Sequence, residues 1–152
     1  MLTRRSLIGL MAATPVALPF LAGPAAAASP EVFSTDAGAI RGIDPVAYFT
    51  QGGPVAGNDE HMLMWRGATW KFSSADNMAM FEANPEAYAP QYGGYCAYAV
   101  SKGGIATTDP EAWTIYEDKL YLNFNLTVRG IWSEDIPGNV AKANANWPSV
   151  LA

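Results

Sequence analysis

The chain has 152 residues, with 14 acidic and nine basic side chains and a formal net charge of −5. This length suffices for one domain with a hydrophobic core. An acidic balance without a basic cluster argues against a nucleic-acid partner, and the single cysteine excludes an internal disulfide.

The first 28 residues have the pattern of a signal peptide. Arg4 and Arg5 precede an apolar stretch from Leu7 to Leu21, and the small residues Ala25 to Ala28 follow it. The paired arginines resemble a twin-arginine signal, which directs folded bacterial proteins across the membrane. An uncleaved membrane anchor is the alternative. We expect cleavage, and a periplasmic protein that has no membrane contact afterwards.

Residues 29–152 form the mature chain under this interpretation. Their formal net charge is about −7, because all the acidic residues remain while Arg4 and Arg5 are lost. Residues 29–42 are mostly small and polar, and we expect them to be a flexible lead-in. The domain itself then covers residues 43–152.

The first half of the domain predicts a hairpin followed by a helix. Residues 62–65 and 68–72 alternate in polarity around the turn Arg66-Gly67, whose glycine accepts a positive φ. A helix over residues 75–83 follows, capped by Ser73 or Ser74. Residues 85–88 then add one more helical turn.

The second half predicts another hairpin and C-terminal helices. Residues 113–116 and 120–124 flank a turn at residues 117–119. A helix with a 3.6-residue apolar period then begins near Asn125 or Thr127 and is interrupted at Pro137-Gly138. The fold class is therefore α+β, a small single domain with short antiparallel hairpins and packed helices.

Several short motifs resemble the YHS domain, a small metal-associated module. They are Asp44-Pro45-Val46, Arg66-Gly67, Phe72-Ser73, Asn84-Pro85 and the run Tyr92-Gly93-Gly94-Tyr95-Cys96. Together with Ala145-Asn146-Trp147-Pro148 they are similar to the exported bacterial branch of the family, over residues 43–148. The resemblance implies a binding module with a YHS-like fold.

The chain departs from the metal-binding members of that family. Where those members carry cysteines, it has Ala47 and residues 73–77. A closed structural zinc site needs about four sulfur or nitrogen ligands. One cysteine and one histidine cannot supply them, so the cysteine-based site of the family is absent.

A soft-metal site remains the sharpest chemical hypothesis. Cys96, His61 and Met64 are candidate ligands for copper, because thiolate and thioether select the monovalent ion. Haem is a further alternative. Methionines beside tryptophans also fill irregular cores, which is the competing interpretation of Met64.

The segment around Cys96 is the candidate cofactor-binding site. Gly93 and Gly94 permit a sharp turn or the close approach of another group, and Tyr92, Tyr95 and Tyr98 supply aromatic walls. Cys96 itself is a buried inert residue, a ligand, or a reactive thiol.

Three functions follow from these features. The first is a periplasmic YHS-type module that binds copper, a metal-bearing cofactor or another small ligand. The second is a structural or interaction domain with an inert cysteine, whose aromatic pocket takes a periplasmic partner protein or a small apolar ligand. The third is a thiol enzyme, in which Cys96 would need His61 as a base and Asp44 as a third polar group. An Asp before a Pro, as at Asp44-Pro45, more often caps a turn, and a non-enzymatic role is favoured.

Overall fold

The computed structural model describes residues 27–152, so the predicted signal peptide lies outside the described residues except for its last two. The strands are β1 (Ser34–Thr35), β2 (Gly38–Ala39), β3 (Asn58–Trp65), β4 (Ala68–Phe72), β5 (Trp113–Tyr116) and β6 (Lys119–Leu122). The helices are α1 (Ala47–Thr50), α2 (Ala75–Ala83), α3 (Pro85–Tyr88), α4 (Ala97–Ser101), α5 (Leu126–Ser133) and α6 (Ile136–Asn146), with 3₁₀ turns η1 (Ile40–Gly42), η2 (Gln91–Gly94) and η3 (Ser149–Leu151). The α+β class is confirmed. Between residues 27 and 152, no helix combines the length and apolar character needed to cross a bilayer.

Both predicted hairpins form antiparallel pairs. β3 and β4 are joined by Arg66 and Gly67, which have φ values of 49° and 73° and so make the tight turn that suits twisted strands. β5 and β6 are also joined by two residues, Glu117 and Asp118. The expected three-residue turn is one residue too long, because Lys119 already pairs with Tyr116.

Three of the helices in the described residues, α2, α5 and α6, begin at side-chain caps. Ser74 accepts a hydrogen bond from the backbone N–H of Asn77 at 3.1 Å and starts α2, as expected. The expected interruption at Pro137-Gly138 is misplaced. α6 begins at Ile136 under the Asp135 cap, so Pro137 lies in its first turn, where no backbone N–H donor is needed.

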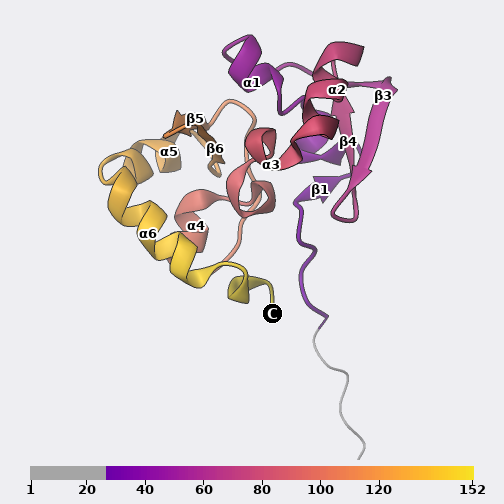
Figure 1. The fold of residues 1–152 in the computed structure, drawn as a ribbon. Coiled ribbons are helices and arrows are strands. Elements are labelled where there is room, and N and C mark those ends of the chain that lie inside the picture. The colour runs from indigo at the N-terminus through magenta and orange to yellow at the C-terminus, as the bar shows by residue number, and fades with distance from the viewer. Residues whose placement is uncertain (1–26) are drawn as a thin grey trace, which may run out of the picture.

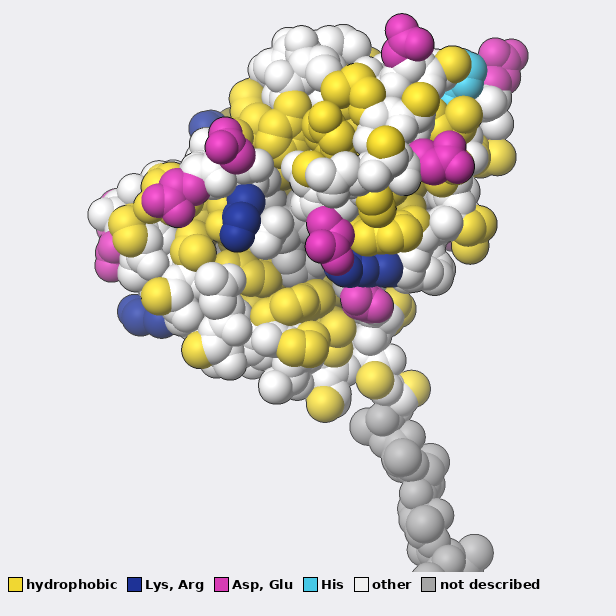
Figure 2. Space-filling model, viewed as in Figure 1, with side chains coloured by type: hydrophobic (Ala, Val, Ile, Leu, Met, Phe, Trp, Pro, Cys, Tyr) yellow, Lys and Arg dark blue, Asp and Glu magenta, His cyan; other side chains and the backbone are white. Residues whose placement is uncertain are grey.

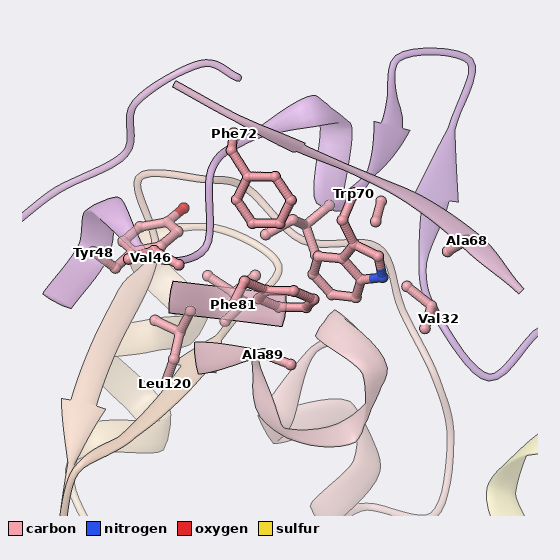
Figure 3. Packing of buried hydrophobic residues seen from close by; sticks show 12 residues of the cluster. Val32, Val46, Tyr48, Ala68, Trp70, Phe72, Phe81, Ala89 and Leu120 are labelled. Atoms are coloured by element: carbon pink, nitrogen blue, oxygen red, sulfur yellow. The ribbon is translucent and has the colours of Figure 1, made fainter. Parts of the chain in front are cut away.

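The molecule has two halves, each with its own hydrophobic cluster. The N-terminal half, with β3, β4 and α2, lies at the upper right of Figure 1, and α4, α5 and α6 form the C-terminal half. Trp70, Phe72 and Phe81 centre the first cluster, and Figure 3 shows their rings gathered together. Tyr121 and Trp132 centre the second, with ring centroids 5.3 Å apart.

Strand β6 joins the two clusters. Leu120 is fully buried in the first cluster and points toward Phe81 in Figure 3, whereas the next residue, Tyr121, is buried in the second. Successive strand residues point to opposite faces, so one short strand supplies both cores. The halves therefore share an element and cannot separate without exposing it.

Residues 29–42 differ from the expected flexible lead-in. Val32 is buried in the first cluster and Phe33 in the second. The N–H of Phe33 donates to the carbonyl of Gly93 at 2.9 Å, and the N–H of Ser29 donates to the carbonyl of Leu151 at 2.7 Å. The first part of this segment, residues 29–33, contacts both halves and holds them together, and it is called the strap below.

Candidate functional site

Asp44 is a structural residue in this fold. Its carboxylate is fully buried and accepts hydrogen bonds from the N–H of Val46 at 2.9 Å, from the N–H and hydroxyl of Ser73 at 2.8 and 2.7 Å, and from the Asn77 amide at 2.8 Å. This geometry matches the interpretation of Asp44 as a turn cap. The same side chain also connects α1 to the start of α2.

Cys96 is buried in the C-terminal half. Its side chain is 1 % exposed, and its thiol donates to the amide oxygen of Asn123 at 3.5 Å. That oxygen also accepts the N–H of Tyr98 at 3.1 Å, which fixes the orientation of the amide. The geometry matches the inert interpretation of this cysteine.

The other two predicted metal ligands lie on β3, in the N-terminal half. Met64 is 71 % exposed, and its sulfur accepts the hydroxyl of Thr69 at 3.0 Å. His61 is half-buried three residues earlier on the same strand. Within residues 27–152, no three His, Cys, Asp or Glu side chains come close enough together to hold a metal ion. The copper site stays a prediction, and these positions give it no support.

The glycine pair is occupied by the chain itself. A Cβ on Gly93 would overlap the carbonyl oxygen of Glu31 in the strap, and one on Gly94 would overlap the side chain of Ile40. Both glycines have positive φ, 62° and 84°. The close approach expected at these positions therefore takes place, but with the N-terminal segment of the same protein.

A groove between the two halves is the strongest candidate site. Its volume is about 470 Å³, within the range of small-molecule sites. It is lined by the loop between β3 and β4, by α3 and η2, and by the start of β6 and the end of α6. The lining residues are Trp65, Arg66, Glu86, Ala89, Pro90, Gln91, Tyr92, Gly93, Lys119, Asn144 and Trp147. Figure 2 shows dark blue basic groups on both sides of a depression in the middle of this face.

Arg66 is held in place on the N-terminal side of the groove. Its guanidinium lies over the Trp65 ring, 4.3 Å from the centroid. It also donates to Glu86 at 2.8 Å and lies 3.6 Å from Glu31 of the strap. The two exposed carboxylates thus compensate its charge.

Tyr92 forms part of the groove wall and has a strained backbone. Its φ of 58° is in the left-handed region, which bulky residues rarely adopt. The hydroxyl donates to the amide oxygen of Asn144 at 2.9 Å, and the ring packs against Trp147 with centroids 6.0 Å apart. Burial, with a smaller contribution from Tyr121, raises the pKa of Tyr92 well above its usual range, so the hydroxyl stays protonated.

Only two of the five predicted cofactor-binding residues line the groove, Tyr92 and Gly93. Tyr95 is buried beside it, and its hydroxyl donates to the carbonyl of Pro30 at 2.8 Å. Tyr98 lies on α4, under the ammonium group of Lys102 at 5.1 Å. Gly94 packs on Ile40, as described above.

Sequence reasoning missed most of the groove. Trp65, Lys119, Asn144 and Trp147 were not expected at a site, because they come from elements that are far apart along the chain. Arg66 and Trp147 belong to the motifs that resemble the YHS family. That resemblance was the only signal pointing toward them.

The groove offers few acidic groups. Among residues 27–152, Glu86 is the only acidic residue that lines it, and Arg66 pairs with that carboxylate. Cys96 is not among the lining residues, so the thiol does not reach a ligand there.

The chain matches no family model, no curated protein and no solved structure.

Proposed function

We propose that this protein is a YHS-type binding module that holds a small organic ligand in the groove between its two halves. The groove itself is the observation that carries the proposal. Two half-buried tryptophans, two cations and a tyrosine with a strained backbone converge there from both halves. Residues with a strained backbone cluster at ligand sites, and they persist only where the surrounding fold holds them in place.

The proposed export of the protein is consistent with a carrier or receptor role outside the cytoplasm. We propose a periplasmic location from the twin-arginine pattern of residues 1–28. Replacing Arg4 and Arg5 by lysine in the precursor is expected to retain it in the cytoplasm, as cell fractionation would measure. Unchanged periplasmic recovery would contradict the twin-arginine route.

A fragment screen by heteronuclear NMR tests the binding proposal. The library should include aromatic and aliphatic molecules, both charged and neutral, and the readout is the indole N–H signal of each tryptophan. We expect ligands to shift the signals of Trp65 and Trp147. Trp113 serves as the internal control, because it packs on Tyr48 away from the groove.

The fragment screen can also contradict the proposed function. A library in which no compound shifts either groove tryptophan contradicts the proposed function. Shifts at Trp113 alone would place the binding site elsewhere on the protein. The second function, an interaction domain, gains support only if a protein partner covers the same two tryptophans.

A further inference from the structure

We infer that the ligand of the groove is a small aromatic carboxylate, whose ring lies against Trp147 and whose anionic group is bound near Lys119. The inference deepens the proposed function and rests on it. Charge, hydrogen-bonding capacity and exposed ring surface each support one part of this assignment.

Among the described residues that line the groove, Lys119 is the cation that makes no salt bridge, although the exposed Glu117 and Asp118 precede it in the turn. The salt bridges found within residues 27–152 pair Arg66 with Glu31 and Glu86 but leave Lys119 without a carboxylate partner. The rest of the protein is acidic, so an anion is repelled from most of the surface. The Lys119 end of the groove is therefore its best position for a negative group.

Asn144 adds a hydrogen-bond donor to the same side. Its amide oxygen is occupied by the Tyr92 hydroxyl, which leaves the NH₂ group available for another acceptor. Asn144 and Lys119 both belong to the C-terminal half, and both line the groove. Two donors without an acidic neighbour among the lining residues on that side call for an acceptor from the ligand.

The accessible tryptophan rings of the groove indicate that the rest of the ligand is aromatic. Trp65 and Trp147 are both half-buried, so each keeps part of its ring accessible at the groove. Arg66 already covers the Trp65 ring, whereas Trp147 contacts Tyr92 and Tyr95 in tilted or edge arrangements. An aromatic ligand extends this ring cluster and buries apolar area that aliphatic acids such as acetate lack.

Three probes of matched shape test the assignment. Indole-3-acetate is the anion, indole-3-acetamide has the same shape without the charge, and tryptamine carries a positive charge. We expect indole-3-acetate to shift the indole signals of Trp65 and Trp147 and to bind up to about fivefold more tightly than the amide, the upper end of the range for an exposed charge contact. Acetate alone should not reach this affinity.

Two lysine variants locate the charge effect. Lys119→Gln is expected to remove the preference for indole-3-acetate over the amide, so that the two bind equally. Lys102→Gln is the matched control, because Lys102 is also exposed but lies over Tyr98 outside the groove. It should leave the preference intact.

The possible failures are distinguishable. If the amide or tryptamine binds as tightly as indole-3-acetate, or if Lys119→Gln keeps the preference, the carboxylate assignment is wrong while the groove remains a binding site. If these probes do not bind but other library compounds shift Trp65 and Trp147, the same conclusion holds. If nothing in the wider library shifts them, the proposed function is wrong as well.

Discussion

At the scale of single residues, the buried side chains of Asp44 and Cys96 differ in how much they contribute to stability. Asp44 accepts several hydrogen bonds and is the only acidic side chain that the described residues bury completely. Cys96 makes one long thiol hydrogen bond. The sequence drew attention to the cysteine because it is unique, yet the geometry gives the aspartate the larger role.

Asp44→Asn is expected to lower the free energy of unfolding by about 3 kcal/mol, because an NH₂ group would face the donors of Ser73 and Asn77. Urea denaturation measures the loss. Asp36→Asn is the control, since Asp36 is exposed and its change should stay within about 0.5 kcal/mol. A loss below about 1 kcal/mol for Asp44→Asn would contradict the structural role.

Cys96 is expected to resist alkylation in the folded protein. Its side chain is 1 % exposed and lines no part of the groove, so iodoacetamide should react only when the region opens. The labelling rate at neutral pH, followed by mass spectrometry, should rise with urea along the unfolding transition. Rapid labelling without urea would support the thiol-enzyme hypothesis instead.

At the scale of elements, the hairpins and helices were predictable because their signals are local. Turn residues, caps and alternation lie next to one another in the chain, as at Arg66-Gly67 and Ser74. The turn of the second hairpin was predicted one residue too long, because Glu117 and Asp118 both adopt positive φ without a glycine. Such a turn has no compositional signal.

The η2 turn shows where local signals end. The glycines predicted a close approach correctly, but nothing local identifies Glu31 and Ile40 as the approaching groups. The groove was not predictable for the same reason. Its walls come from separate parts of the chain, which the strap and β6 hold together in the folded protein.

Gly93→Ala tests the contact between η2 and the strap. The new Cβ would overlap the carbonyl oxygen of Glu31 in a left-handed backbone, so we expect a loss of about 3 kcal/mol or more in unfolding free energy. Gly103→Ala is the matched control. Its φ is 86°, also left-handed, but nothing lies within 4 Å, so strain alone should cost about 1 kcal/mol.

Thermal or urea unfolding of both variants gives the comparison. The difference between them isolates steric overlap from backbone strain. Equal losses would mean that the strap moves freely away from Gly93, and that it does not hold the halves together as described.

At the scale of the whole molecule, the buried tyrosines of the aromatic core make the protein less stable at alkaline pH. Burial is the main cause that raises the pKa of Tyr48 and Tyr92 above their ordinary value of 10.0, and burial also raises that of Tyr95. Above about pH 10, the unfolded chain loses protons that the folded protein keeps. Ionisation therefore favours unfolding in that range.

We expect the free energy of unfolding to be insensitive to these tyrosines below pH 10 and to fall as the pH rises above it. Circular dichroism with the ultraviolet absorbance of tyrosinate measures both events on one sample. Tyr48→Phe and Tyr92→Phe should each weaken the pH dependence, because phenylalanine cannot ionise. A stability that stays constant in strong alkali would show that these hydroxyls ionise without unfolding.

The hydrogen bond between Ser29 and Leu151 brings the two extremities of the described domain side by side, and Figure 1 shows both on the same side of the molecule. A short peptide linker would bridge them with little distortion. A circular permutant reopened between the exposed residues Gly103 and Gly104 should consequently keep the same architecture. In that case the fold does not need the peptide bond between Gly103 and Gly104, and it keeps the contact between Ser29 and Leu151.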